Sequence, residues 1–555
     1  MRQAIVIEYG RGEAQLLGQQ APAWDSRIRE RQGIEGIERS NPFIERAHGW
    51  NIRRRRTFDL HLIYTPAVSA VRPRYDTLIR RAVLFDGTGG APIPCDVAIT
   101  GACIAAVAPE GTIDPAVADV VWEARGRALA PGFIDVHAHD DISAVRAPEM
   151  TPKISQGVTT VIVGNCGISA APVTLAGAPP EPMNLLGRAE AFVYPTFAAY
   201  VEAVNAARPA VNVAAFVGHT SLRNNHLDRL DRAARPRELD AMREQLREAL
   251  GNGALGLSTG LAYRNAHAAS TEEVIALAEP LSEIGGLYCT HLRSEAAGIL
   301  DAIEEARVIG HSACVPVAIS HLKCAGIDNH GRSSEVLRAL ADLPGAQPIG
   351  WDCYPYTASS TTLDLAAVTD AFDILVTWSD PQPRQSGRLL AEIARDWHVD
   401  LREAAARLQP AGAVYFCMAA EDVDQILRDP RTAVGSDGLP NDAHPHPRLW
   451  GTFPRVLGHY VRDRQLFSLA EAVRKMTGLS ADRFGLARRG YVREGNWADL
   501  VMFDPETIRD MASYAEPAQP AAGIAMVWVN GTLTWRDGMA TGSRAGRFLS
   551  WNDKQ

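Results

Sequence analysis

The amino-acid sequence predicts an α/β protein: a closed (β/α)8 barrel of the TIM type, with a small β-sandwich domain formed from both ends of the chain. Between residues 131 and 485, apolar strand-like runs alternate with helical stretches. Repeated units of this kind and number favour a parallel barrel. The alternative is a doubly wound open sheet, which the lack of a G-x-G-x-x-G stretch after an early strand disfavours.

The composition narrows the class of protein. The 555 residues are 46% hydrophobic and 22% charged, a profile typical of soluble globular proteins. A net charge of -9 argues against a nucleic-acid partner and is compatible with a small-molecule substrate. We expect no membrane partner, because the sequence has neither a run of about 18 apolar residues nor a signal peptide. The 8 scattered cysteines predict a reducing, cytoplasmic setting. The oligomeric state is left open.

Residues 1–74 differ from the rest of the chain. They contain the basic run Arg53–Arg56 and show no sustained hydrophobic periodicity. We interpret them as a poorly ordered N-terminal extension, or as the result of a start codon assigned too early. An arm that binds nucleic acid or a membrane surface is the alternative.

The small β domain is predicted over residues 75–130 and 486–545. Short strand-like runs occur near each end of the chain, and they are separated by turn residues. Both ends are therefore expected to pair in one domain, with the barrel inserted between them and a tail over residues 546–555. The runs are 78–85, 95–99, 104–108, 498–504 and 524–531.

Within the barrel region, strands are predicted at 158–163, 211–217 and 315–319, and a helix at 236–250. The stretch from about 363 to 412 interrupts this alternation of strands and helices and is helical in composition. We interpret it as an insertion on a barrel loop, in the position of a lid over the site. One ordinary barrel helix with long connections is the alternative.

Two histidines one residue apart follow the apolar run that begins at Pro131. In an extended strand, His137 and His139 would point to the same face, with Ala138 turned away. Two imidazoles at the end of a buried strand can hold a divalent metal. The alternative is a pair of histidines on a half-exposed strand.

Further residues of the metal-ligand type come directly after other apolar or small-residue runs. In a barrel the reactive side chains lie at the C-terminal ends of the strands, so these residues are expected to converge. They are Cys166, His219, His291, His321 and Asp437. For His219, packing in the interior is an equally good interpretation.

These residues resemble a known family. The segments His137-Ala138-His139, His291, His321 and Ser436-Asp437 look like the metal-site signature of the amidohydrolase superfamily. Within it, the segments Gly164–Gly167, Thr290–Arg293, Ser320–Lys323 and Tyr354–Tyr356 are similar to the N-acyl-D-amino-acid deacylases, also called D-aminoacylases. The likeness spans about residues 75–538. Many superfamily members bridge two metals with a carboxylated lysine, whereas this branch uses a cysteine, which fits Cys166.

The resemblance implies a zinc enzyme, and zinc accepts both imidazole and thiolate ligands. Cys166, His291 and His321 would form a tight site. His137 and His139, with Cys166 bridging, would form a second and weaker one, so that one or two metals are bound.

Asp437 is the candidate general base and acid, which takes a proton from water and returns it to the leaving nitrogen. The alternative is that Asp437 is a metal ligand without proton transfer.

The resemblance also places the substrate's α-carboxylate on Arg448, with Tyr354 and Ser360 beside it. The guanidinium fork suits a carboxylate. The alternative for these three residues is an ordinary loop role. Lys323, two residues after His321, would meet either an acidic side chain of the substrate or a neighbouring carboxylate of the protein, and the sequence does not choose.

The predicted activity is hydrolysis of N-acyl-D-amino acids to a D-amino acid and a carboxylate. Handedness of the substrate comes from the resemblance alone. A cyclic-amide hydrolase of the hydantoinase or dihydroorotase kind is the rival enzyme, and the presence of Cys166 without a barrel lysine argues against it. A catalytically silent metal-binding barrel is the rival of another class, which an intact Asp437 disfavours.

Overall fold

The computed structural model describes residues 74–175, 177–342 and 348–554. The predicted N-terminal extension lies outside the described residues, apart from Arg74. All elements below belong to the unit that spans Val71–Gln555.

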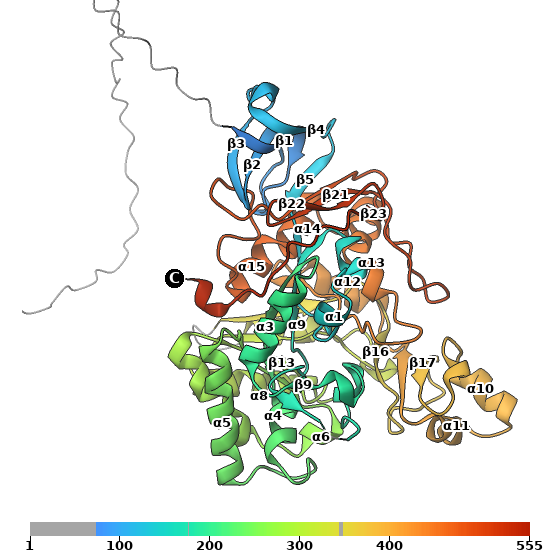
Figure 1. Cartoon of the computed structure of the whole chain (residues 1–555). Helices are drawn as coiled ribbons and strands as arrows, with labels where there is room; N and C mark the ends of the chain where they lie inside the picture. The colour runs from blue at the N-terminus through green and yellow to red at the C-terminus, as the bar shows by residue number, and fades with distance from the viewer. Residues whose placement is uncertain (1–73, 176, 343–347, 555) are drawn as a thin grey trace, which may run out of the picture. The chain divides into compact units, whose positions relative to one another are not determined.

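Strands from both ends of the chain share one nine-stranded sheet within the described residues, in the order β23-β22-β21-β20-β5-β1-β2-β3, with β4 beside β1. The two ends meet where β5 pairs antiparallel with β20, Ala130 opposite Val501. Figure 1 shows β1–β5 in blue next to the red β21 and β22. The strands are β1 (Tyr75–Leu84), β2 (Ile93–Thr100), β3 (Cys103–Pro109), β4 (Ala118–Glu123), β5 (Ala128–Pro131), β20 (Leu500–Phe503), β21 (Ile524–Val529), β22 (Thr532–Arg536) and β23 (Met539–Ala540).

The middle of the chain forms the barrel, so the predicted fold class is confirmed. Its strands pair in parallel in sequence order, and a parallel bridge between Ala138 and Gly438 joins the first strand end to the last. Strand β7 coincides with its predicted range, because it consists entirely of β-branched residues, which favour strands, and all of them are buried. The strands are β6 (Phe133–Asp135), β7 (Val158–Val163), β10 (Asn212–Ala215) with its continuation β11 (Val217–Gly218), β12 (Gly256–Gly260), β13 (Leu287–His291), β14 (Val317–Ile319), β15 (Ile349–Cys353) and β19 (Thr432–Val434).

Helices follow the barrel strands. The predicted helix at 236–250 is α5 (Pro236–Gly251): proline occupies its first turn, Glu238 accepts from the Arg235 amide, and its buried residues face the core. The others are α1 (Ser143–Arg146), α2 (Thr151–Ile154), α3 (Phe197–Ala207), α4 (His219–His226), α6 (Arg264–His267), α7 (Thr271–Ala278), α8 (Ile299–Ser312), α9 (Ser333–Ala341), α12 (Ala420–Arg428), α13 (Arg448–Arg455), the π-helix η7 (Val456–Asp463), α14 (Leu469–Met476) and α15 (Gly478–Phe484).

Short elements complete the chain. Strands β8 (Val173–Thr174) and β9 (Val193–Tyr194) pair with each other. The 3-10 turns are η1 (Pro115–Val117), η2 (Met183–Leu185), η3 (Ala189–Ala191), η4 (Glu279–Ile284), η5 (Ile327–Asn329), η6 (Pro383–Gln385) and η8 (Trp551–Lys554). Among the helices of the described residues, none combines the length and the apolarity that crossing a membrane requires.

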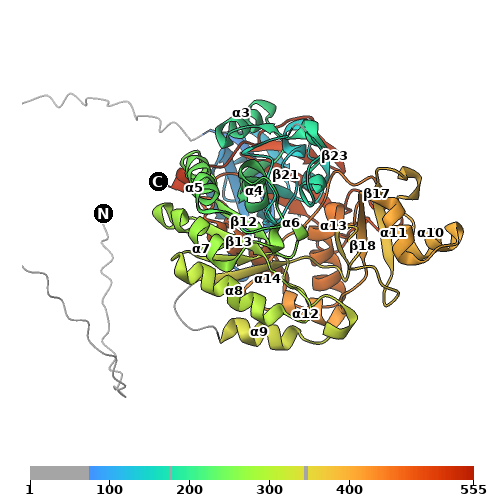
Figure 2. The same ribbon diagram turned by 90° about the horizontal axis from the view of Figure 1, so that it is seen from below.

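The stretch interpreted as a helical insertion contains more than helices. Strands β16 (Ser359–Thr362), β17 (Ile374–Ser379) and β18 (Ala411–Tyr415) form an antiparallel sheet, accompanied by α10 (Leu390–Trp397) and α11 (Leu401–Leu408). Figure 2 shows these elements together at one side of the barrel. Composition missed the strands because β18 pairs with two segments that lie far from it in the sequence.

The predicted tail at residues 546–555 is also corrected, as far as residue 554. Phe548 and Leu549 are buried, and Phe548 bridges to Val213 of β10. The Trp551 indole donates a hydrogen bond to the Ile284 carbonyl at 2.9 Å. The segment 546–554 is too short to show a hydrophobic periodicity in the sequence. Only its packing in the structure identifies it as part of the core.

Candidate metal centre

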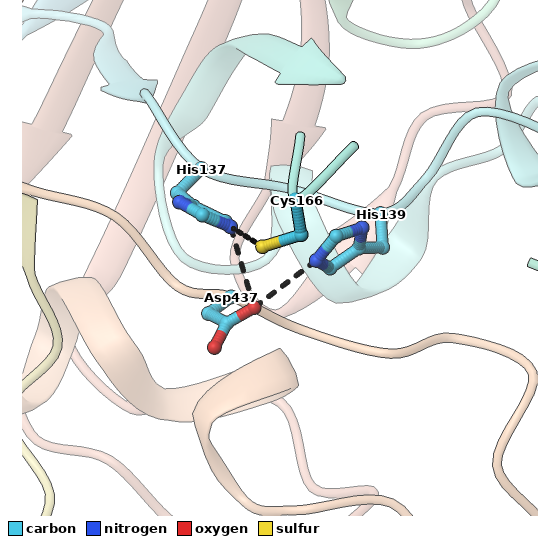
Figure 3. A group of neighbouring side chains, drawn as sticks. All are labelled: His137, His139, Cys166 and Asp437. Carbon is cyan, nitrogen blue, oxygen red and sulfur yellow. Dashed lines mark hydrogen bonds and ion pairs between the residues drawn. The ribbon is translucent and has the colours of Figure 1, made fainter. Parts of the chain in front are cut away.

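Two groups of potential metal ligands lie side by side and share one sulfur atom. The first consists of His137, His139, Cys166 and Asp437, and the second of Cys166, His291 and His321. The ligand atoms of each group lie within 4.8 Å of one another, and all of these residues are buried. Figure 3 shows the first group, with both imidazoles directed towards the sulfur and the carboxylate. The structure therefore brings together all the residues that the sequence nominated as ligands or as the proton acceptor, except His219.

His219 is placed elsewhere. Its Nε2 lies 3.1 Å from Glu273 Oε1, and the carboxylate of Glu273 also pairs with Arg223. Glu273 Oε2 in turn accepts the Ala234 amide at 2.8 Å. His219 thus belongs to a buried cluster that holds a surface loop, which is the packing role that the sequence left open.

The two histidines of the H-x-H segment lie just beyond a strand, which corrects the expected extended geometry. Strand β6 ends at Asp135. The Ala138 amide donates to the Ile162 carbonyl at 3.0 Å, and the Asp437 amide donates to the His137 carbonyl at 2.7 Å. These backbone bonds, rather than strand alternation, fix the two imidazoles, whose ring centroids are 5.4 Å apart.

Three of the site residues have left-handed backbone conformations. The φ angles are 54° at Cys166, 35° at His321 and 51° at Asp437. Residues other than glycine adopt positive φ uncommonly, and such positions are concentrated at functional sites. The turns at these strand ends therefore serve to aim the side chains at one point.

The contacts at this point are short. Cys166 Sγ lies 3.2 Å from His137 Nε2 and 3.3 Å from His321 Nε2. Asp437 Oδ1 lies 3.1 Å from His139 Nε2 and 3.4 Å from His137 Nε2. Among the described residues, the buried His291 Nδ1 has no hydrogen-bond partner. A divalent cation would satisfy this nitrogen and draw on imidazole, thiolate and carboxylate donors, all of which zinc accepts.

Burial sets the charge of these groups. It lowers the pKa of His137 to about 3, and it lowers the pKa of His321 to about 3 with help from the Lys323 ammonium. Both imidazoles are therefore neutral at neutral pH, which is the form that binds metals. Burial also raises the pKa of the Cys166 thiol well above its ordinary value. A bound cation reverses this effect, because it favours the thiolate.

The carboxylate of Asp437 is kept ionised. Burial by itself raises its pKa, but the Arg448 guanidinium, helped by the hydrogen bond with His139, outweighs that effect and holds the pKa well below its ordinary value. Arg448 NH1 lies 2.9 Å from Asp437 Oδ2. Asp437 is therefore in the form that can accept a proton.

Lys153, a buried residue of helix α2, links the backbone segments that carry the site residues. Lys153 Nζ lies 2.8 Å from Asp135 Oδ2, 3.0 Å from Asp140 Oδ2 and 3.0 Å from Ser436 Oγ. Asp135 also accepts the Ser436 amide at 2.8 Å. This network ties the segment that carries His137 to the segment that carries Asp437. In the sequence, Asp135, two positions before His137, was the feature that could have indicated a buried partner for a lysine.

The three residues expected to bind a carboxylate lie together. Arg448 is fully buried, its NH2 donates to the Ser360 carbonyl at 2.9 Å, and its guanidinium lies 4.7 Å from the Tyr354 ring centroid. Among the described residues, Arg448 Nε, Tyr354 OH and Ser360 Oγ are buried without a hydrogen-bond partner. Buried donors normally have partners, so this group has the chemistry of a receptor for an anion.

Lys323 has a partner from the protein itself. Its Nζ lies 2.5 Å from Glu295 Oε1 and 2.7 Å from His321 Nδ1. Of the two roles that the sequence left open, this structure has the one in which Lys323 meets a neighbouring carboxylate. Glu295 was not nominated by the sequence analysis, although its place four residues after His291 was a usable signal.

Comparison with known proteins gives consistent results. The model of the amidohydrolase family matches residues 120–534. D-aminoacylase of Alcaligenes xylosoxydans xylosoxydans is 47% identical over 476 residues, which cover 86% of this chain and 98% of that protein. N-acyl-D-aspartate deacylase of the same organism is 47% identical over 480 residues, with coverage of 86% and 95%. The structure of N-acyl-D-glutamate deacylase from Bordetella bronchiseptica, solved with zinc and a phosphonate mimic of the tetrahedral intermediate, is 43% identical and covers 86% of this chain and all of its own, with a TM-score of 0.81.

The shared sulfur predicts how metal binding responds to mutation. Cys166→Ala is expected to lose most bound zinc, because both ligand groups lose the same atom. Zinc per chain after dialysis, measured by plasma mass spectrometry, checks this. Cys289→Ala is the matched control, since Cys289 is equally buried but belongs to neither group. A Cys166→Ala protein with the zinc content of the wild type would contradict the assignment.

Proposed function

This chain belongs to the amidohydrolase family, and on that premise we propose that it hydrolyses the linear amide bond of N-acyl-D-amino acids, releasing a D-amino acid and a carboxylate. The observation that carries the proposal is the contact between the two ligand groups and the buried anion receptor, joined by the ion pair of Asp437 and Arg448. Support for this substrate class comes from the relatives named D-aminoacylase and N-acyl-D-aspartate deacylase.

The metal we expect is zinc. Cys166, His291 and His321 would hold it most tightly, and His137 and His139 would contribute to a second position with Cys166 between the two. Bound zinc supplies Lewis acidity, which polarises an amide carbonyl and lowers the pKa of a coordinated water. The relative from Bordetella bronchiseptica was solved with zinc, which supports this choice of metal.

Asp437 is proposed to carry the proton. Its Oδ1 faces the two imidazoles of the H-x-H segment, and its Oδ2 faces Arg448. From this position the carboxylate can accept a proton from the attacking water and return it to the amide nitrogen, which is too basic to leave unprotonated. The same carboxylate would therefore act as the general base in the attack by water and as the general acid when the nitrogen leaves.

The α-carboxylate of the substrate is proposed to bind Arg448, Tyr354 and Ser360. Their unpaired Nε, OH and Oγ groups provide donors of the kind that a carboxylate accepts. A hydantoin has no free α-carboxylate, so this receptor supports a linear substrate over the cyclic-amide rival. The side chain of the preferred amino acid is left open, because relatives of equal identity are named for different substrates.

We propose the cytoplasm as the compartment and a small molecule as the partner. The eight cysteines are free thiols in the structure, seven of them buried or partly buried. Such thiols persist in a reducing compartment.

The activity itself can be tested on enantiomeric pairs. With zinc supplied, the protein is expected to release amino acid from N-acetyl-D-amino acids and not from the L-enantiomers or from a hydantoin. Chelation of the metal should abolish release, and zinc should restore it. Amino-acid release measured by chiral chromatography checks this, and hydrolysis confined to the L-series or to the hydantoin would refute the proposal.

Asp437→Asn tests the proton carrier. We expect kcat to fall about 10²- to 10⁴-fold, the range of general acid–base catalysis, while zinc content stays near the wild-type value. The melting temperature should fall, because Arg448 loses its buried counter-charge. Steady-state kinetics checks this. Asp422→Asn, which alters a buried carboxylate that bonds two backbone amides far along the chain, should keep kcat. Retained turnover in Asp437→Asn would remove its assigned role.

Arg448→Met tests the carboxylate receptor. For N-acetyl-D-leucine, kcat/KM is expected to fall about 30-fold or more, the equivalent of about 2 kcal/mol lost with a buried charge partner. N-acetyl-D-leucinamide has no carboxylate, so its decrease should be smaller and should reflect only the loss of the guanidinium beside the Asp437 carboxylate. Equal losses for both substrates would show that Arg448 does not read the carboxylate.

A further inference from the structure

Glu295 spans the two histidines of the second ligand group. It follows strand β13 as the fourth residue after His291. Its Oε1 lies 2.9 Å from His321 Nδ1, and its Oε2 lies 3.4 Å from His291 Nε2. One carboxylate thus presents one oxygen to each imidazole, and its side chain is only 15% exposed.

The opposite nitrogens of the same rings face the shared sulfur or have no partner. His321 Nε2 lies 3.3 Å from Cys166 Sγ. His291 Nδ1 is buried without a hydrogen-bond partner among the described residues. The two rings are 4.4 Å apart at their centroids and nearly perpendicular, at 88°. Each imidazole therefore directs one nitrogen to Glu295 and the other away from it.

This arrangement determines where the ring proton is. A neutral imidazole has one N–H and one lone pair, and the hydrogen bond made by one nitrogen decides the state of the other. If Nδ1 of His321 donates to Glu295, the lone pair of Nε2 points to the sulfur side. Acceptors behind a ligand histidine act in this way in metalloproteins, where they fix both tautomer and ring orientation.

Lys323 makes the identity of residue 295 decisive. Its ammonium lies against both Glu295 Oε1 and His321 Nδ1. With the carboxylate present, Lys323 can donate to Glu295. With glutamine at this position, one carbonyl oxygen remains for the two donors Lys323 and His321. Lys323 is then expected to bond His321 Nδ1, which would place the ring proton on Nε2. The ligand lone pair would then be lost.

We propose that Glu295 is a positioning residue that fixes the ligand tautomers of His291 and His321, and that Lys323 serves as its counter-ion. The proposal deepens the proposed function, since it rests on metal binding by Cys166, His291 and His321. It also gives Lys323 a partner within the protein.

Glu295→Gln provides the test, with zinc affinity as the readout. Competition with a chromogenic chelator is expected to show an apparent zinc affinity about 10- to 100-fold weaker than that of the wild type, the usual effect of losing such a partner. Glu273→Gln is the matched control, because Glu273 also contacts a buried histidine, His219, but one outside both ligand groups. It should keep wild-type zinc affinity. Wild-type affinity in a folded Glu295→Gln protein would overturn the proposal.

A double variant separates this role from simple destabilisation. Glu295→Gln combined with Lys323→Met leaves no ammonium to bond His321 Nδ1, while the glutamine carbonyl can still accept from it. The double variant is therefore expected to bind zinc more tightly than Glu295→Gln alone. An equal or weaker affinity would show that Lys323 is not the counter-ion. If the wild type itself binds no zinc, the proposed function fails first, so the two failures are distinguishable.

Discussion

The candidate metal centre depends on closure of the barrel between its first and last strands. The Asp437 amide donates to the His137 carbonyl at 2.7 Å, and Ala138 bridges to Gly438. This contact brings Asp437 within 3.1 Å of His139, a residue 298 positions earlier in the chain. Because the carboxyl ends of parallel strands meet at one rim, closure alone is enough to gather ligands from distant segments.

Two buried ammonium groups near the ligands have carboxylate partners. Lys153 pairs with Asp135 behind the H-x-H segment, and Lys323 pairs with Glu295 behind the second group. An unpaired buried charge costs several kcal/mol, so these pairs hold the segments in a single arrangement. His137 and His321 stay neutral among these charges, because burial lowers the pKa of each to about 3.

The use of a cysteine in place of a bridging lysine has a structural consequence. One sulfur belongs to both ligand groups, so the two groups share an atom. The Asp437 carboxylate contacts the first group on one side and Arg448 on the other. The proposed carboxylate receptor and the candidate metal centre are therefore joined by a single ion pair, which suits a substrate whose carboxylate is close to its scissile amide.

Local sequence patterns were enough to place the barrel strands and the ligands at their ends. The range 158–163 is a strand as predicted: all six residues are β-branched valine, isoleucine or threonine, which favour strands, and all are buried. Cys166 and Asp437 were identifiable because they directly follow such runs. The strands of the insertion were not, since their pairing joins segments 50 to 56 residues apart, from Thr362 with Gly412 to Ser359 with Tyr415.

By itself, the sequence determined the fold class, the ligand types and the family. Only the tertiary structure decided which polar groups pair next to the ligands: Glu295 with Lys323, 28 positions apart, and Lys153 with the Ser436 hydroxyl, 283 positions apart. Residues adjacent in the sequence largely determine whether a segment forms a strand or a helix, so local sequence patterns can predict it. The partner of a buried charge is set by which strand ends meet at the rim, and no local pattern records that.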